Sequence, residues 1–317
     1  MRIVRHAHLC PEAARGAVIA LGNFDGVHLG HRAVIGHAID IARKTSAPAA
    51  VMTFEPHPRE FFSPDKTRLR MYPLQEKLAM LKDIGVDVVF LMHFNKGLAA
   101  TSAHDFVDDV LHTKLKAAHV VTGYDFAFGK GREGNTEMLA QYAQAAGFGF
   151  TAYPQVLNDT MTVSSSAIRA LLTDGKVEQA SRLLGQPYRI SGHVRSGEAR
   201  GRTLGIPTAN ISLSHLFKPR LGVYAVRARL AGEPVWHDAV ASIGTKPTFT
   251  PTQALLEVYI FDFSRSIYGQ KLEVEFYHFL RPELRFSSAE ALITQMHADI
   301  SDVKSFFSAN QPACIVS

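Results

Sequence analysis

The stretch AVIALGNFDGVHLGH, residues 17–31, decides how the first half of the chain folds. Its first five residues form a short apolar run bounded by glycine, which is typical of an interior strand in a parallel sheet. Beyond it, apolar residues recur at helical spacing at Val34, Ile35, Ala38, Ile39 and Ala42. The stretch therefore predicts a strand, a glycine-rich turn and a helix in direct succession.

Two histidines, His28 and His31, lie at the predicted start of this helix. Glycines in the turn let the backbone approach a ligand closely, and the free N–H groups of a helix N-terminus bind phosphate. Histidines placed there can donate hydrogen bonds to phosphate oxygens as charge develops in a transition state. The alternative is two surface histidines in a glycine-rich turn, but the strand–turn–helix context favours phosphate chemistry.

The composition permits two domains and a small phosphate-rich ligand. A chain of 317 residues suits about two domains, and its hydrophobic content of 46% can fill two cores. The net charge of +5 could indicate nucleic acid as a partner, but Lys and Arg form no runs. We therefore expect a small ligand and no nucleic acid.

The cysteines fit a reducing compartment, and the N-terminus resembles no signal peptide. Cys10 and Cys314 lie at opposite ends of the chain and offer neither a zinc-type spacing nor a disulfide framework. The first six residues, MRIVRH, hold no apolar signal core, and no segment reaches a membrane-spanning length. We expect a soluble cytoplasmic protein that does not contact a membrane.

Strand-like and helix-like segments alternate through the first half of the chain. Such alternation predicts a parallel sheet with helices on both faces, and ligands of such sheets lie beyond the carboxyl ends of the strands, at the switch point. The strand-like segments after the first are 49–54, 86–92, 119–122 and 148–153, and the helical ones are 74–84, 103–115 and 136–146.

Beyond Gln186-Pro187 the pattern changes to strands alone. Segments rich in Val, Ile, Tyr and Phe are separated by Gly, Pro and Asn, which predicts an antiparallel sheet or small β-barrel. A terminal helix is expected to start at Ser287, in a capping box with Glu290. We therefore expect two domains, 1–186 and 187–317. The predicted strands are 188–194, 222–230, 235–243, 255–263 and 271–280.

The segment 123–135, GYDFAFGKGREGN, contains a G-x-G-x-x-G pattern from Gly129 to Gly134. A dinucleotide-binding fingerprint turns directly out of its strand and has an acidic residue about 20 positions on, and this segment has neither feature. The other interpretation is a phosphate or flavin loop. Asp125 could alternatively serve only as a cap on the approach to the next helix.

Two further segments combine ordinary local roles with possible ligand contacts. Ser164, Ser165 and Ser166 open a predicted helix as caps, but Arg169 one turn later favours an anion site. The turn containing Pro56 and His57 is either a rigid proline-bracketed loop or a ligand contact.

In the second half, the loop 201–210, GRTLGIPTAN, has no Walker A lysine. Gly201 and Gly205 would let backbone N–H groups face phosphate, and Thr208 and Asn210 would supply hard oxygen atoms for Mg²⁺. A simple turn is the alternative. Glu257 is an acid within an otherwise apolar strand, and such a residue usually points to solvent.

The H-x-G-H pattern of His28 to His31 resembles the signature of the nucleotidyltransferase superfamily, which indicates a reaction class and no substrate. The fuller string with Asn23-Phe24-Asp25-Gly26 resembles the start of the bacterial bifunctional riboflavin kinase/FMN adenylyltransferases, or FAD synthetases. Blocks similar to those of this family follow in its order, from about residue 1 to 306. They are G-x-D-F-x-F-G-x-x-R-x-G, S-S-T-x-x-R with Ser166 for threonine, F-x-P-H-P, and G-x-x-x-G-x-P-T-A-N, with further matches at 222–226, 247–249 and 257–269.

The resemblance implies a Rossmann-like adenylyltransferase domain in which FMN attacks the α-phosphorus of ATP to give FAD and pyrophosphate. It implies that His28 and His31 stabilise the developing charge and that Arg169 holds the leaving phosphates. The implied ATP contacts are Gly22, Phe24, Gly30, Ser164, Ser165 and Ser166, and the implied flavin contacts are Asn23, Asp125, Phe128, Pro56 and His57.

For the second half, the resemblance implies a barrel that phosphorylates riboflavin with ATP. Glu257 would be the general base for the riboflavin 5′-hydroxyl, worth about 10²–10⁴-fold in rate. Tyr259 and Ser242 replace the histidine and asparagine common in the family, and we expect neither to touch the Mg²⁺ ligands or Glu257. Two alternatives stay open: a barrel that only binds flavin, and a nucleic-acid-binding protein that handles tRNA. The oligomeric state is left open.

Overall fold

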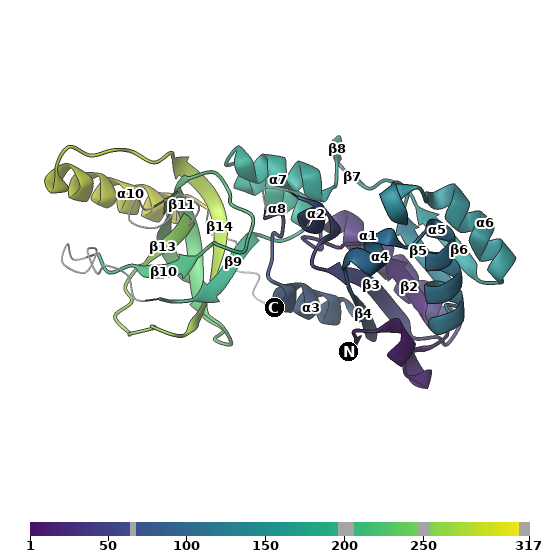
Figure 1. Cartoon of the computed structure of the whole chain (residues 1–317). Coiled ribbons are helices and arrows are strands. Elements are labelled where there is room, and N and C mark those ends of the chain that lie inside the picture. The colour runs from purple at the N-terminus through teal and green to yellow at the C-terminus, as the bar shows by residue number, and fades with distance from the viewer. Residues whose placement is uncertain (64–67, 196–205, 246–253, 311–317) are drawn as a thin grey trace. The chain divides into compact units, whose positions relative to one another are not determined.

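A computed structural model describes residues 1–63, 68–195, 206–245 and 254–310 of the chain. These residues pack as two compact units, 1–165 and 166–317. Each unit is described by itself (Figure 1). None of the helices in the described ranges is both long and apolar enough to span a bilayer.

The first unit is built on a six-stranded parallel sheet with the order β1-β4-β3-β2-β5-β6. The expected Rossmann-like architecture is confirmed, with β1 added at the edge, where its three residues pair with β4. The strands are β1 (Arg2–Val4), β2 (Val18–Leu21), β3 (Ala49–Glu55), β4 (Val88–His93), β5 (His119–Gly123) and β6 (Gly149–Tyr153).

Helices cover both faces of this sheet, because both faces of its strands are apolar. Val18 and Ala20 of β2 pack with α1 (Leu29–Lys44) and α3 (Leu74–Ile84). Ile19 and Leu21 point to the other face, onto α5 (Ala103–Asp105), the π-helix η3 (Phe106–Lys114) and α6 (Thr136–Ala146). The shorter elements are η1 (Ala7–Leu9), η2 (Glu12–Ala14), α2 (Pro58–Phe62), α4 (Lys96–Ala100), η4 (Lys130–Arg132) and the hairpin of β7 (Leu157–Asn158) with β8 (Met161–Thr162).

The strand order creates a switch point between β2 and β5. The chain leaves β2 toward β3 and β4 on one side, whereas β5 and β6 extend the sheet on the other side of β2. The turns that follow β2 and β5 therefore meet at one carboxyl edge, where doubly wound sheets bind their ligands.

The second unit contains a six-stranded antiparallel sheet in the order β10-β13-β12-β11-β14-β9. The backbone N–H of Arg195 donates to the carbonyl of Asn210 at 2.9 Å, which joins the two edges into a nearly closed barrel. The expected barrel is thus confirmed. Its strands are β9 (Tyr188–His193), β10 (Ala209–Ser212), β11 (Gly222–Leu230), β12 (His237–Thr245), β13 (Ala254–Ile260) and β14 (Lys271–Arg281).

Two helices that precede the expected domain boundary at residue 186 pack on this barrel. They are α7 (Ser165–Thr173) and α8 (Val177–Leu184). The N–H of Arg220 donates to the carbonyl of Leu172 at 2.9 Å, and the N–H of Tyr188 donates to Ser181 Oγ at 3.1 Å. By packing, the chain divides at residue 165, and a functional boundary near 186 stays a prediction.

The terminal helix α10 (Ala289–Ala309) covers part of the outer face of the barrel, where its Val303 and Phe307 pack with Ala225 and Phe261. The expected cap was wrong by one residue. Ser288, not Ser287, accepts the hydrogen bond, from the N–H of Ala291 at 3.2 Å.

Candidate functional site

The turn between β2 and α1 places His28 and His31 together at a helix N-terminus. His28 is the N-cap of α1, and its Nδ1 accepts a hydrogen bond from the N–H of His31 at 3.2 Å. The two rings stack with centroids 3.5 Å apart and planes 18° apart. Because Nδ1 of His28 accepts, the neutral ring carries its proton on Nε2 and can donate from there.

The backbone of this turn is strained in two places. Phe24 and Val27 both have left-handed φ angles, of 51° and 42°. A β-branched residue in this region is a rare exception, and such strain costs roughly 1–3 kcal/mol per residue unless the surroundings impose it. The Phe24 ring is buried and meets His31 edge-on at 5.2 Å, so only its backbone is placed to face a phosphate.

Two glycines that were predicted to contact ATP, Gly22 and Gly30, are closely packed by neighbouring protein atoms. A Cβ on Gly22 would lie 3.1 Å from the Phe24 ring. A Cβ on Gly30 would lie 3.3 Å from both the His28 ring and the carbonyl oxygen of Val163. The segment before α7 therefore runs close to the start of α1.

The turn between β2 and α1, residues 22–28, is called the histidine turn below. The serine segment, Ser164 to Ser166, contacts this turn through Ser165, whose Oγ donates to the carbonyl of Asp25 at 2.8 Å. Ser164 is half-buried and Ser166 is exposed in the first turn of α7. Arg169 follows Ser165 by one helical turn, is buried, and belongs to the second unit. The two motifs that the sequence placed far apart thus begin at one location.

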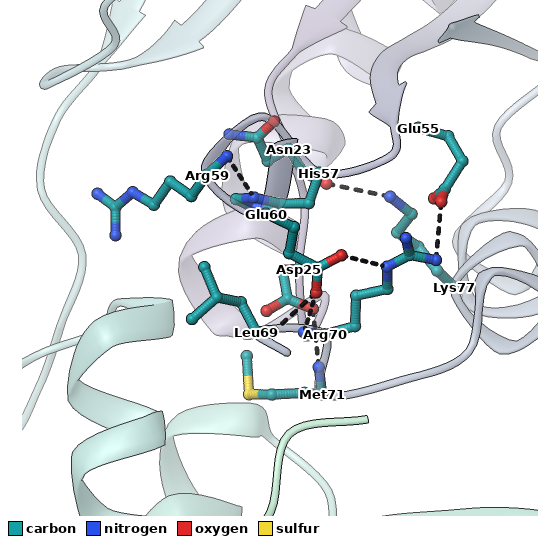
Figure 2. A network of polar contacts seen from close by, with 10 residues as sticks. All are labelled: Asn23, Asp25, Glu55, His57, Arg59, Glu60, Leu69, Arg70, Met71 and Lys77. Carbon is teal, nitrogen blue, oxygen red and sulfur yellow. Dashed lines mark hydrogen bonds and ion pairs between the residues drawn. The ribbon is translucent and has the colours of Figure 1, made fainter. Parts of the chain in front are cut away.

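Side chains from β3 and α3 hold the carbonyl of Asn23, and Figure 2 shows the contact from Lys77 of α3. Thr53 Oγ1 donates to this oxygen at 2.9 Å, and Lys77 Nζ lies 3.2 Å from it and 3.1 Å from Thr53 Oγ1. The side-chain Oδ1 of Asn23 is buried and has no hydrogen-bond partner among the described residues. That oxygen can accept a hydrogen bond, and its contact with flavin stays a prediction.

A second group of hydrogen bonds and ion pairs holds residues 68–71. Asp25 Oδ1 accepts from the N–H of Met71 at 3.1 Å. Glu60 Oε1 accepts from the N–H of Leu69 at 2.8 Å, and its Oε2 lies 3.0 Å from Arg70 Nε. Arg70 also pairs with Glu55 at 2.7 Å. This network ties the histidine turn, the end of β3 and α2 into one assembly (Figure 2).

Thr53, Lys77, Glu60 and Arg70 belong to no motif that the sequence showed. Lys77 had a readable signal, since it stands three residues after Leu74 and one before Leu78, within the apolar stripe of its helix. Burial lowers the pKa of Lys77, and the nearby carboxylates of Asp25 and Glu55 oppose that effect.

The turn of Pro56 and His57 follows β3 directly. His57 is buried and is the N-cap of α2, where its Nδ1 accepts from the N–H of Arg59 at 3.1 Å. Pro56 is half-buried. The capping role of His57 is therefore shown, and its contact with flavin stays a prediction.

The segment after β5 closes on itself instead of turning into a helix. Phe128 and Gly134 exchange backbone hydrogen bonds of 3.0 and 2.9 Å, and α6 starts only after its cap Asn135. The dinucleotide-binding fingerprint is thus excluded here, as expected. A Cβ on Gly134 would lie 2.8 Å from the Phe128 ring, so this glycine serves packing.

Asp125 and Phe128 differ in exposure within this segment. Asp125 is exposed and close to Gly123, at the carboxyl end of β5. It does not cap α6, since Asn135 does. Phe128 is buried and stacks on Phe126 with centroids 5.8 Å apart. Their proposed contacts with flavin stay predictions.

In the second unit, strand register brings Asn210 and Glu257 face to face. Asn210 of β10 lies directly opposite Glu257 of β13, and Glu257 lies opposite Ser242 of β12. Directly opposite side chains have Cβ atoms about 4.5–5.5 Å apart. Ser242, which was expected not to touch Glu257, is thus its neighbour across the ladder, and the sequence alone does not show this register. The segment of Asn210, expected as a loop, is the strand β10.

Asn210 has the features of a cation ligand. Its side chain is buried, its Nδ2 donates to the carbonyl of Thr208 at 3.4 Å, and its Oδ1 has no hydrogen-bond partner in the described part of the chain. Thr208 is half-buried just before β10. Within the described ranges, no group of three or more His, Cys, Asp or Glu side chains could hold a metal instead. Gly201, Gly205 and the block 247–249 lie outside the described residues.

Comparisons with known proteins match both halves of the chain. A family model for FAD synthetase matches residues 10–167, and one for riboflavin kinase matches residues 184–307. A bifunctional riboflavin kinase/FMN adenylyltransferase of Listeria monocytogenes is 43% identical over 92% of each chain. Its namesake in Escherichia coli K12 is 38% identical over 99% of this chain and 100% of its own.

A solved crystal structure also covers both units. It is described as a macrolide-efflux protein of Streptococcus pneumoniae, is 31% identical, and aligns with a TM-score of 0.83 over 95% of this chain and 98% of its own. The two family models and the near-complete relatives agree with the motif order. The chain belongs to the family of bifunctional riboflavin kinase/FMN adenylyltransferases.

Proposed function

We propose that this chain phosphorylates riboflavin with ATP to FMN in its barrel, and then adenylylates FMN with ATP to FAD and pyrophosphate in its α/β half. The observation that supports this best is that a chain of this family has, in each half, a group of side chains suited to phosphate chemistry. One has stacked histidines at a helix N-terminus, and the other has Asn210 opposite Glu257 on a barrel.

In the adenylylation, an oxygen of the FMN phosphate attacks the α-phosphorus of ATP, and the bond from that phosphorus to the bridging oxygen breaks to release pyrophosphate. The protein positions the reactants and stabilises charge, and it needs no covalent intermediate. His28 and His31 donate to the oxygens on which charge develops. Arg169 binds the leaving phosphates through its guanidinium.

In the kinase reaction, the 5′-hydroxyl oxygen of riboflavin attacks the γ-phosphorus of ATP, and ADP leaves. Glu257 accepts the hydroxyl proton as a general base. Its half-buried position on a ladder between Asn210 and Ser242 supports this role, because backbone pairing fixes the strand that carries the carboxylate. This geometry favours a kinase over a barrel that merely binds flavin, because such a module needs no base beside a cation ligand.

We propose Mg²⁺ as the divalent ion that accompanies ATP. Thr208 and Asn210 would hold it, and the buried Oδ1 of Asn210 fits this role because Mg²⁺ prefers oxygen ligands. When bound, the ion neutralises charge on the phosphate oxygens. A cytoplasmic location and the absence of nucleic acid and membrane partners stay predictions.

One experiment tests both activities. The pure protein is incubated with riboflavin, ATP and Mg²⁺, and the flavin products are separated by chromatography; parallel reactions start from FMN or omit ATP. We expect FMN and FAD from riboflavin, and FAD from FMN. If FAD forms from FMN but no FMN forms from riboflavin, only the adenylyltransferase activity is supported. If neither product forms, the proposal is contradicted. Salt-sensitive tRNA binding without flavin turnover would favour the nucleic-acid alternative.

A further inference from the structure

The strongest feature that the proposed mechanism leaves unused is the ammonium group of Lys77. It lies at the carboxyl end of the parallel sheet. There Thr53 is the last buried residue of β3, and Asn23 follows the end of β2. Lys77 Nζ lies 3.2 Å from the carbonyl oxygen of Asn23 (Figure 2). It also lies 3.1 Å from Thr53 Oγ1. Both contacts lie at the carboxyl ends of the strands, so the lysine joins α3 to the histidine turn.

A lysine is unusual on this face of α3, because the neighbouring positions on the same face are apolar. Leu78 and Leu81 beside it belong to the apolar core, and Lys77 interrupts their stripe. Burial of an ammonium group disfavours its charged form, and a methionine of similar length would pack there without that cost. A residue that only filled the core would therefore be apolar.

The turn that Lys77 holds is the part of the site under strain. Phe24 follows Asn23 directly with a φ of 51°, and Val27 precedes the cap His28 with a φ of 42°. Left-handed residues of this kind persist only where surrounding contacts impose them. Fixing the carbonyl of Asn23 sets the start of the turn, and the cap at His28 sets its end.

We propose that Lys77 is a positioning residue for adenylyl transfer, which holds the carbonyl of Asn23 so that the strained turn presents His28 and His31 to the phosphates. Lys77 acts through Asn23 and touches neither reactant. This inference rests on the proposed function of the α/β half. It assigns the residue a role in the turnover step, since displaced histidines stabilise the transition state poorly while the substrates still bind.

The test compares Lys77→Met with Lys82→Met. Met keeps the length of the side chain and removes the ammonium, and Lys82 is an exposed lysine on the same helix. We expect Lys77→Met to lower kcat for FAD formation from FMN by about 10- to 100-fold, with less than about a threefold change in KM, because a misplacement of about 1 Å can cost 10²-fold. Lys82→Met should match the wild type.

The kinase activity of the same molecules is the internal control. FMN formation from riboflavin should stay within about twofold of the wild type in both variants, and Tm should stay within about 3 °C. An unchanged kcat for adenylylation in Lys77→Met would overturn the inference. A parallel loss of both activities and of Tm would also overturn it, since that result indicates a purely structural role.

Two further variants sharpen the assignment. Thr53→Val removes the other donor to the same carbonyl, so the double variant with Lys77→Met should lose much less than the product of the two single losses. Lys77→Arg keeps the charge and should recover part of kcat. If the wild type makes no FAD from FMN, the proposed function fails; if it does and the two losses multiply independently, only the role of Lys77 fails.

Discussion

The two halves of this chain fix their phosphate sites by different means. In the α/β half, the site is a backbone turn between β2 and α1, held by side chains from β3, α3 and the 68–71 segment. In the barrel, the site consists of side chains on neighbouring strands, held by the hydrogen-bonded ladder itself. A turn depends on the side chains that clamp it, whereas a ladder depends on backbone pairing that single substitutions rarely change.

This difference has a consequence for mutation. Residues that touch no substrate, such as Lys77, should matter in the α/β half. In the barrel, the large effects should be confined to residues that face the reactants. Four variants break or sharpen the comparison. The first three can each be measured against the other activity of the same molecule, and the fourth is measured by thermal unfolding.

The largest expected effect is that of Glu257→Gln on the barrel. Glutamine keeps the shape of the side chain but does not accept the hydroxyl proton, so FMN formation from riboflavin should fall by about 10²–10⁴-fold. FAD formation from FMN should stay within twofold, by chromatography of the products. Asp302→Asn, at an exposed acid on α10, is the matched control. Unchanged kinase turnover in Glu257→Gln would refute the assignment of the base.

His28→Asn should give the opposite pattern, with a somewhat smaller effect. Asparagine is a good N-cap and should preserve the start of α1, whereas it lacks the ring that stacks on His31. FAD formation should fall by about 10²–10³-fold, as for the loss of one donor to a developing oxyanion. Kinase turnover should not change. The control is His112→Asn, at an exposed histidine of η3; equal activity of both variants would argue against His28.

Ser242→Asn tests the neighbour of Glu257 that register places opposite it. A changed cross-strand pair alters free energies by about 0.2–1 kcal/mol, which corresponds to at most about fivefold in kinetic constants. We therefore expect a change of less than about fivefold in KM for riboflavin or in kinase kcat, and none in adenylylation. An effect beyond tenfold would mean that Ser242 contacts a reactant directly.

The smallest effect concerns pH and Lys77. Burial lowers the pKa of Lys77 below its ordinary value of 10.5. Between the folded pKa and 10.5 the unfolded chain binds more protons, so the cost of burying the charge, present at lower pH, fades as pH rises. The wild type should therefore gain stability relative to Lys77→Met between pH 7 and 10, by a few °C in Tm.

The measurement is thermal unfolding of the wild type, Lys77→Met and Lys82→Met at both pH values. The wild type and Lys82→Met should differ equally at pH 7 and pH 10. If the difference between wild type and Lys77→Met moves the other way with pH, the ammonium is stabilised by its carboxylate neighbours more than burial disfavours it.

Much of the α/β half could be predicted because its signals are local. The helix 74–84 and the helix 136–146 lie where periodicity placed them, and residues 18–21 form the expected strand. The cap at His28 is likewise a matter of neighbouring residues. The missed helix cap at Ser288 shows the limit of such patterns, since two adjacent serines offer the same hydroxyl.

Strand β10 and the clamps on Asn23 could not be predicted in this way. The four residues of β10 become a strand only through pairing with β13, which lies more than 40 positions later in the chain. Thr53 and Lys77 meet one carbonyl from 30 and 54 positions away. Nothing in their own neighbourhoods specifies those contacts.

Residue order alone settled the kinds of element, the two fold classes and the chemistry that each motif can support, because periodicity, caps and turn residues act within a few positions. Three-dimensional packing decided which groups meet: Ser165 with Asp25, Lys77 with Asn23, and Glu257 with Asn210 on one side and Ser242 on the other. The physical reason is that register and long-range hydrogen bonds form only when distant segments are brought together by burial of their apolar faces.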